Sequence, residues 1–216
     1  MYFDFSNGGY KMGTTCNHKQ ITDDHVFLST LNKLNLNKNL VASTKQVHLD
    51  KIKYIKSAGF YKSYDGLITN IKHKLILVIK TADCVPIFIY DNNKGIYGLI
   101  HAGWKGVQKK IHMNAIERFL DLNSELNDIC IVLGPSIKDC CFEIKEDVVQ
   151  LFDNQFILNK NNSLYLNLNE CIKSDLETMG VENIKINQIC SFDNKRCHSF
   201  RRDGILSGRM YSFITY

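Results

Sequence analysis

Three short polar clusters in this sequence carry side chains suited to metal chemistry. Each follows an apolar run typical of a strand: Gln46-Val47-His48, Thr81-Ala82-Asp83-Cys84 and His101-Ala102-Gly103-Trp104. A rigid sheet can hold side chains at a strand end while they reach into a loop or cavity. Two imidazoles and one thiolate leave the fourth position of a tetrahedral zinc ion for water, as in catalytic zinc sites. His48, Cys84 and His101 are therefore candidate ligands of one metal ion.

The same residues allow two other interpretations. Cys84 could act as a nucleophile, with His101 or His48 as its base and Asp83 orienting the imidazole. The cysteines could instead be inert core residues, because unpaired cysteine is commonly buried. The three candidate ligands are far apart in the sequence and match no local structural-zinc motif. The residues alone do not rank metal binding against nucleophilic catalysis.

The remaining cysteines and the arginines suggest further chemistry. There are eight cysteines, with no CxxC pair, which excludes a zinc ribbon and a thioredoxin motif. Four arginines gather near the C-terminus: Arg196, Arg201, Arg202 and Arg209. Guanidinium groups bind anions in a bidentate manner, so this cluster is a candidate anion site, with surface charge as the alternative.

The elements that must position these residues alternate between strand and helix patterns. Helices are predicted at 22–34, 104–122, 145–152 and 168–179, from apolar residues at helical spacing and from capping residues. Strands are predicted at 40–47, 66–69, 75–80, 86–90, 96–100, 129–133, 184–190 and 209–214. Hairpin signals argue against a purely parallel sheet. We therefore expect an α/β fold of the α+β type, a layered single domain over residues 1–216 with mixed β-sheets flanked by helices.

Composition and charge narrow the class of protein. The 216 residues are 44% hydrophobic, enough for a large core, and the net charge of +5 is spread along the chain. We therefore expect no nucleic-acid partner. No apolar run is long enough to span a membrane, and the first residues do not resemble a signal peptide. These features predict a cytoplasmic protein without a membrane partner.

Several motifs together resemble the laccase-domain family, also called the YfiH-like or peptidoglycan editing factor family. The matching segments occur in the family's order: Gln46-Val47-His48, Asp65-Gly66-Leu67-Ile68-Thr69, Thr81 to Ile87, His101 to Gly106, Gly134-Pro135-Ser136-Ile137, Cys140-Cys141-Phe142-Glu143, Ser199 to Gly204 and Gly208-Arg209. The resemblance implies a layered α/β fold and a zinc ion held by His48, Cys84 and His101. It also implies phosphorolysis of adenosine, inosine and methylthioadenosine, and hydrolytic deamination of adenosine. The sequence lacks the repeated His-rich pattern of several copper centres, so copper oxidase chemistry is not expected.

The implied chemistry assigns roles to further residues. In deamination a carboxylate moves a proton to the leaving ammonia, and Asp83 and Glu143 are the candidates. In phosphorolysis Lys105, Arg201, Arg202 and Arg209 are candidates for binding phosphate. Lys105 stands where the family usually has arginine, which removes a bidentate donor.

Two other functions remain as alternatives. One is a cysteine hydrolase or amidase that uses Cys84, and the other is an editing factor that binds a peptidoglycan precursor. For the leading interpretation the expected partners are purine nucleosides and phosphate, and the expected state is a monomer or a small homo-oligomer.

Overall fold

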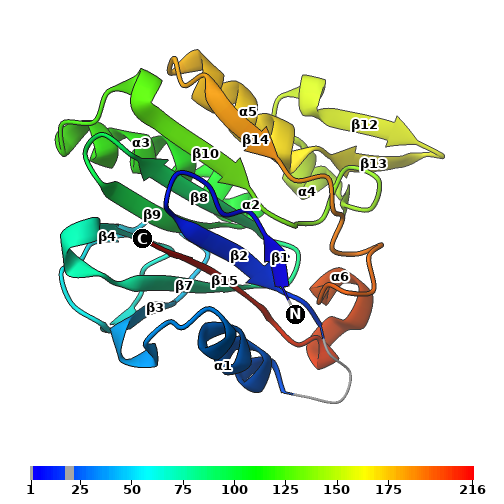
Figure 1. Ribbon diagram of the computed structural model, residues 1–216. Helices are drawn as coiled ribbons and strands as arrows, with labels where there is room; N and C mark the ends of the chain where they lie inside the picture. The colour runs from blue at the N-terminus through cyan, green and yellow to red at the C-terminus, as the bar shows by residue number, and fades with distance from the viewer. Residues whose placement is uncertain (1, 18–21) are drawn as a thin grey trace.

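Two stacked six-stranded sheets form the centre of the computed structural model, which describes residues 2–17 and 22–216 (Figure 1). The β7 sheet has the order β1 (Tyr2–Asp4), β2 (Lys11–Thr15), β15 (Met210–Thr215), β7 (Ile76–Thr81), β3 (Val41–Lys45) and β5 (Gly59–Lys62). The β8 sheet has the order β14 (Asn183–Ile186), β10 (Ile129–Leu133), β8 (Val85–Asp91), β9 (Ile96–Ala102), β6 (Gly66–Asn70) and β4 (Ile52–Tyr54).

Alternation of side chains along each strand explains why the sheets stack. Successive residues of a strand point to opposite faces, and the apolar strands here are buried on both faces. Leu77 and Ile79 of β7 belong to the same buried cluster as Phe88 and Tyr90 of β8, between the sheets. The intervening residues of both strands point outward and pack under helices.

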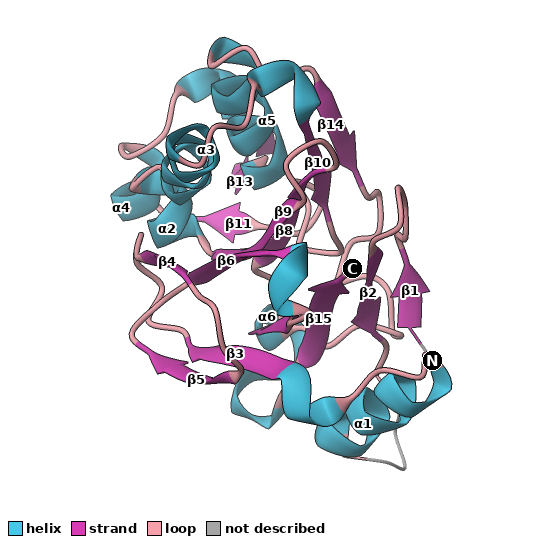
Figure 2. Ribbon diagram, turned by 60° about the vertical axis from the view of Figure 1, so that its left-hand side comes forward, coloured by secondary structure: helices cyan, strands magenta, loops and turns pink. Residues whose placement is uncertain are grey.

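Helices cover the two outer faces, which gives a helix–sheet–sheet–helix order (Figure 2). Helix α1 (Asp23–Lys33) packs Phe27 and Leu31 on the β7 sheet. On the other side α2 (Trp104–Gln108), α3 (Ile111–Asp121) and α5 (Leu168–Thr178) pack against the β8 sheet. This layered α/β arrangement with mixed parallel and antiparallel pairing confirms the predicted fold class.

Smaller elements complete the structure. A three-stranded antiparallel sheet contains β11 (Glu143–Ile144), β13 (Ser163–Leu166) and β12 (Ile157–Lys160). The helices α4 (Glu146–Val149) and α6 (Phe200–Asp203) are single turns. Short 3₁₀ helices are η1 (Lys38–Leu40), η2 (Ile71–His73), η3 (Leu126–Asp128), η4 (Asn154–Phe156) and η5 (Gly204–Leu206).

Three predicted elements differ from the structure. The helix predicted at 104–122 is broken at Lys110, whose φ of 59° is left-handed, because the Lys110 N–H donates to the Val107 carbonyl at 2.9 Å in a turn that ends α2. The helix predicted at 145–152 has one turn, α4. The strand predicted at 184–190 ends at Ile186, since the Asn187 side chain accepts the Ile189 N–H at 2.9 Å and turns the chain.

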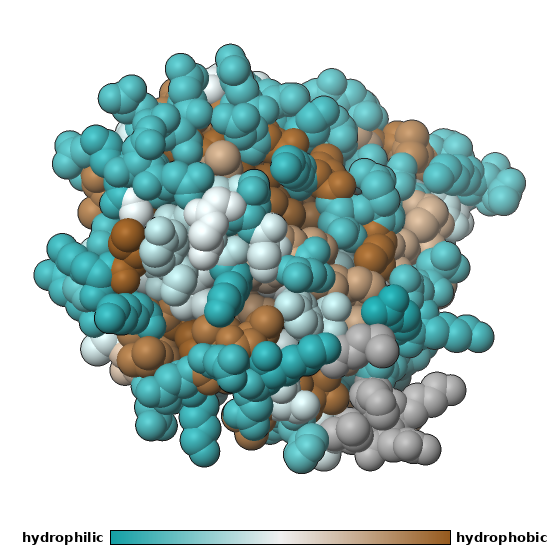
Figure 3. Space-filling model, viewed as in Figure 1, coloured by the Kyte–Doolittle hydropathy of each residue, from teal (hydrophilic) through white to brown (hydrophobic). Residues whose placement is uncertain are grey.

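The surface carries little contiguous apolar area on the face seen in Figure 3, where hydrophobic side chains occur in several small groups among hydrophilic ones. Within residues 2–17 and 22–216, no helix combines the length and the apolarity needed to cross a membrane.

Candidate active site

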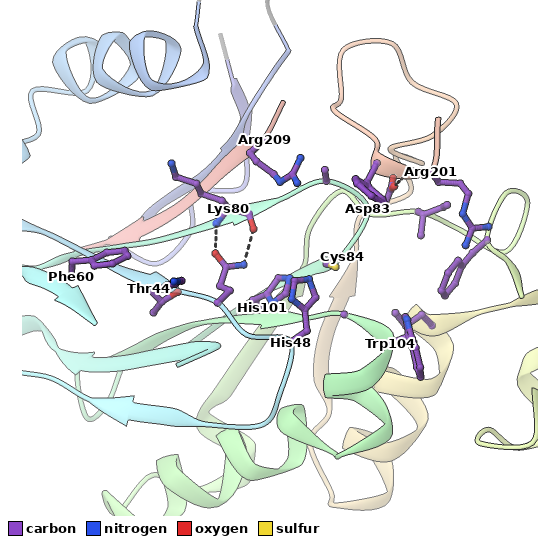
Figure 4. A pocket seen from close by; sticks show the side chains of 18 residues that line it. Thr44, His48, Phe60, Lys80, Asp83, Cys84, His101, Trp104, Arg201 and Arg209 are labelled. Atoms are coloured by element: carbon purple, nitrogen blue, oxygen red, sulfur yellow. Dashed lines mark hydrogen bonds between the residues drawn. The ribbon is translucent and has the colours of Figure 1, made fainter. Parts of the chain in front are cut away.

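The candidate metal ligands come from segments that lie at the same end of the two sheets (Figure 4). His48 follows β3 in the β7 sheet, Cys84 lies where the chain passes from β7 to β8, and His101 is near the end of β9. One ligand atom from each residue lies within 4.8 Å of those of the other two. The two imidazole rings are perpendicular, with centroids 4.7 Å apart. The structure therefore brings the three residues together in an arrangement that could hold a metal ion.

Asp65 positions both histidines. This fully buried carboxylate lies 2.9 Å from His101 Nδ1 and accepts the backbone N–H groups of Val47, His48 and Leu49 at 2.9 to 3.2 Å. Burial raises the pKa of Asp65, but the hydrogen bonds from His101 and from the backbone outweigh burial and hold the pKa below its usual value. Because Nδ1 of His101 is engaged, Nε2 is the ring atom left for a metal.

The backbone is strained beside these ligands. His48 has a φ of 58° and Asp83 a φ of 88°, both in the left-handed region that non-glycine residues seldom adopt. Such strain is typical of functional sites, where the surrounding structure holds it in place. Here the contacts of Asp65 with the His48 loop provide that support.

The thiol and the imidazoles influence each other's ionisation. Burial raises the pKa of the Cys84 thiol, but His101 and His48 lower it more strongly, to about 6. Burial lowers the pKa of His101, but Cys84 and Asp65 raise it to about 9. A thiolate is the form of cysteine that binds metal and attacks electrophiles, so both chemistries are favoured.

A cavity of about 740 Å³ opens beside the three residues. Its basic lining residues are Lys45, Lys80, Arg201 and Arg209, and its aromatic ones are Phe60, Trp104, Phe142 and Phe200. Among the described residues that line it, Asp83 is the only one with a carboxylate. The cavity therefore offers positive charge and apolar rings together, which suits an anion bound beside a planar apolar group.

Asp83 anchors two segments at the cavity wall. Its Oδ1 accepts the Ser191 hydroxyl at 2.7 Å, and its Oδ2 accepts the backbone N–H of Arg201 at 2.7 Å. These bonds tie α6, with the Arg201 side chain, to the turn that contains Cys84. Asp83 does not contact His101 through any hydrogen bond of the described residues, and Asp65 occupies that position instead.

The other predicted site residues divide into two groups. Arg201 and Arg209 line the cavity, and each donates to backbone carbonyls: Arg201 to Glu143, and Arg209 to Ser207 and Gly208. Arg202 lies outside the lining and donates to Asp203 and to the carbonyls of Ser191, Phe192 and Cys197.

Glu143 and Lys105 also lie away from the main cavity lining. The Glu143 carboxylate accepts the Ser163 hydroxyl at 2.8 Å. Lys105 holds its ammonium 5.4 Å from the centre of the Trp104 ring and lines a smaller cavity of about 390 Å³ on another side of His48 and Cys84.

Sequence reasoning assigned no role to Asp65, Ser191, Lys80 or Phe60, which the structure places in or behind the site. Asp65 stands in the motif Asp65 to Thr69, but nothing in the sequence indicates that its carboxylate is buried.

Comparison with known proteins identifies the family. The family profile described as "Multi-copper polyphenol oxidoreductase laccase" matches residues 7–216. The chain belongs to this family. This result confirms the resemblance seen in the sequence motifs.

Named relatives in this family include nucleoside enzymes. A purine nucleoside phosphorylase of Clostridium acetobutylicum is 36% identical over 184 residues, 81% of this chain and 76% of the relative. Adenosine deaminase RL5, from an unknown prokaryotic organism, is 32% identical over 161 residues, 69% of this chain and 61% of the relative.

Solved structures share the fold. The crystal structure of the Bacillus licheniformis hypothetical protein YfiH matches with a TM-score of 0.84 and 26% identity, over 95% of this chain and 92% of that one. YlmD from Geobacillus stearothermophilus matches with a TM-score of 0.87 and 24% identity, over 96% and 92% of the two chains.

Proposed function

We propose that this chain is a zinc-dependent purine nucleoside phosphorylase that also deaminates adenosine by hydrolysis. The observation that carries the proposal is one cavity that combines the His48, Cys84 and His101 cluster with basic and aromatic side chains. The names of the relatives support the substrate class. When bound, zinc supplies a Lewis acid that can polarise water or a substrate oxygen.

The donor set fits zinc better than a hard cation. Two imidazoles and a thiolate are the ligands that zinc prefers, and the His101 ring is oriented by a buried carboxylate, as in many zinc sites. Three protein ligands would leave a fourth position of such an ion for water or substrate.

The basic residues of the cavity are the proposed phosphate-binding residues. Arg201 and Arg209 each use part of the guanidinium group to bind backbone carbonyls, which restricts the plane of the group before substrate arrives. Their remaining N–H donors, with the ammonium of Lys80, can bind phosphate oxygens. Holding phosphate next to the ribose makes the attack on C1′ effectively unimolecular.

Aromatic side chains provide a surface for the purine. Phe60 and Phe200 line the cavity although 59% and 54% of their areas are exposed. A purine base against one of these rings would cover apolar area that otherwise faces water. Trp104, half-buried at the start of α2, contributes a third ring.

Asp83 is the proposed proton carrier in deamination, because its carboxylate lines the cavity while that of Glu143 is bound to Ser163. Each Asp83 oxygen accepts one of the two hydrogen bonds described above and keeps a lone pair for a proton.

The test is turnover by metal-free and zinc-reconstituted protein. With phosphate present, we expect the enzyme to release free purine base from adenosine or inosine. Without phosphate, we expect it to convert adenosine to inosine. Both activities should appear only after zinc is restored. His48→Ala, Cys84→Ala and His101→Ala should each lose most zinc and most turnover while remaining folded. Full activity in metal-free Cys84→Ala protein would refute this proposal.

A second candidate function is a cysteine hydrolase. One observation favours it: the Cys84 sulfur, the His101 imidazole and the Asp65 carboxylate follow one another as in a nucleophile–base–acid series. This function requires a covalent acyl group on Cys84, detectable by intact-protein mass spectrometry, and activity that chelators do not change.

A further inference from the structure

We propose that Cys140, Cys141 and Cys190 form a second metal site, in which three thiolates bind a soft cation such as Zn²⁺. The three sulfurs lie within 4.8 Å of one another, and those of Cys140 and Cys141 are 3.2 Å apart. This cluster shares no residue with the cavity beside His48, Cys84 and His101. Thiolate ligands select zinc and similar soft ions over magnesium or calcium.

Two chain segments far apart in the sequence bring the sulfurs together. Cys140 and Cys141 lie in the turn between β10 and β11, and Cys190 follows β14. The segments pair through Ser136, whose carbonyl accepts the Ser191 N–H at 3.0 Å. Within the turn, the Cys141 N–H donates to the Lys138 carbonyl at 2.9 Å. The cluster is therefore held by backbone hydrogen bonds and does not depend on a disulfide.

The surroundings of Cys190 suit a bound thiolate. The ammonium of Lys138 donates to Asn169 Oδ1 at 2.9 Å and lines the same cavity as Cys140 and Cys190, where its positive charge would offset part of the negative charge of the thiolates.

A cavity next to the three cysteines gives an ion access to the cluster. Cys140 and Cys190 line a cavity of about 620 Å³ that also contains the side chains of Asp139 and Asp193. A fourth ligand can come from water in this cavity, which gives zinc its usual four-coordinate geometry. An ion can enter from the same side, because Cys140 is exposed.

This site would support one wall of the main cavity. Cys141 precedes Phe142, which lines that cavity, and Cys190 precedes Ser191, which binds Asp83. An ion that joins the two segments would hold Phe142 and Asp83 at fixed separation. The proposed role is structural and does not depend on which reaction occurs next to Cys84.

The test uses protein in which the first site has lost its thiolate. Reduced Cys84→Ser protein is stripped of metal and titrated with Cd²⁺, whose thiolate complexes absorb in the ultraviolet, and with Zn²⁺ in competition with a chromogenic chelator. We expect one equivalent of thiolate-bound Cd²⁺. Adding Cys140→Ser or Cys190→Ser should weaken binding at least about tenfold and remove most of the absorbance.

Cys130→Ser provides the matched control, because Cys130 is also partly exposed and lies outside both clusters. In the Cys84→Ser background it should leave the absorbance unchanged, and circular dichroism should show all variants folded. The proposal fails if reduced Cys84→Ser protein gives no thiolate absorbance, or if Cys140→Ser and Cys130→Ser behave alike. Turnover by the wild-type enzyme is not a readout, so this failure would leave the proposed function intact.

Discussion

Asp65 is a fully buried carboxylate that contacts two of the candidate metal ligands at once. Its carboxylate is hydrogen-bonded to Nδ1 of the His101 ring and accepts three successive backbone N–H groups of the His48 loop. One buried charge thus sets the orientation of two candidate ligands from different sheets. Removing that charge should affect both ligands at once.

Asp65→Asn tests this role. The amide keeps the size of the carboxyl, but its NH2 group faces N–H donors and cannot accept from them. We expect zinc affinity to fall about 10- to 100-fold, measured by competition with a chromogenic chelator, with turnover reduced in parallel at limiting zinc. Asp121→Asn, at an exposed carboxylate, is the control. Unchanged zinc affinity in Asp65→Asn would show that the carboxylate does not position the ligands.

The two groups of arginines predict opposite phenotypes. Arg209→Met removes a cavity donor and should raise the KM for phosphate about tenfold or more, with a smaller effect on the KM for nucleoside.

Arg202→Met removes hydrogen bonds to Asp203 and to three backbone carbonyls and should lower the free energy of unfolding by about 2 kcal/mol, with little change in the KM for phosphate. Steady-state kinetics and urea unfolding separate the two effects, and equal KM values for phosphate would argue against Arg209 as a binding residue.

At the scale of elements, helix α2 approaches the ligand cluster closely. It begins after Gly103, where an added Cβ would lie 3.1 Å from Cys84 Sγ and 3.2 Å from His48 Cδ2. The backbone of Gly103 is extended, with a φ of −77°, so any residue could adopt it. Contact with the ligands, and not conformational freedom, is what favours glycine here.

Gly103→Ala should therefore act on the metal site and spare the fold. The methyl group must displace the Cys84 sulfur or the His48 ring by a few tenths of an ångström. We expect weaker zinc binding and lower turnover, and an unchanged circular dichroism spectrum. Gln108→Ala, exposed on the same helix, is the matched control. Equal zinc affinity in the two variants would contradict the close approach of α2.

The sequence predicts the elements that carry the ligands better than the elements around them. Long apolar strands such as β8 and β9 are recognisable because both faces are buried. The short strands β4, β5 and β12 have mixed exposure and no clear periodicity, so their residues alone do not mark them as strands. The break at Lys110 is not marked in the sequence, because neither glycine nor proline stands at this position or beside it.

The sequence likewise predicts the candidate ligands better than the residues that position them. The clusters at His48, Cys84 and His101 stand out because reactive residue types follow apolar runs, and the structure brings them together. The carboxylate that binds His101 could not be predicted from the sequence. Asp83 is the candidate because it is next to Cys84 in the chain, whereas the structure places Asp65 against His101. Which arginine enters the cavity depended on α6, a single turn held by Asp83.

At the scale of the whole molecule, the candidate ligands join the two central sheets. His48 follows β3 of the β7 sheet, His101 lies in β9 of the β8 sheet, and Cys84 lies in the connection between β7 and β8. An ion bound to all three would bind the folded chain and not the unfolded one, and so would stabilise the entire fold.

Zinc should therefore raise the melting temperature of metal-free protein. At 100 times the dissociation constant the gain is about 2.7 kcal/mol, which is roughly 5–10 °C for a chain of this size. Differential scanning calorimetry with and without zinc measures this shift, and His48→Ala should lose most of it. A shift that survives in His48→Ala but disappears in Cys140→Ser would assign the stabilisation to the thiol cluster instead.

Acid stability is expected to depend on His112, a histidine that belongs to neither metal-binding cluster. His112 of α3 is fully buried, and its Nε2 lies 2.8 Å from the Asp175 carboxylate of α5, which also binds Lys110. Burial lowers the pKa of His112 more than Asp175 raises it. Below pH 6.5, the usual histidine pKa, the unfolded chain binds a proton that the folded chain does not, so stability falls with falling pH.

His112→Gln should flatten that dependence. In wild-type protein the contribution of one such proton approaches about 1.4 kcal/mol per pH unit below the unfolded pKa. Urea unfolding at several pH values between 8 and 5 gives the slope for both proteins. Identical slopes would show that His112 does not account for the acid sensitivity.

The buried Asp65 carboxylate has a consequence for how a metal is acquired. Hydrogen bonds to this carboxylate hold the His48 loop and the His101 ring through contacts that belong to the protein itself. A preformed set of nitrogen and sulfur donors ranks divalent ions by the Irving–Williams series, in which copper(II) exceeds zinc. The metal content of a freshly purified sample will then follow the growth medium, and only reconstitution with each ion in turn reveals which one supports turnover.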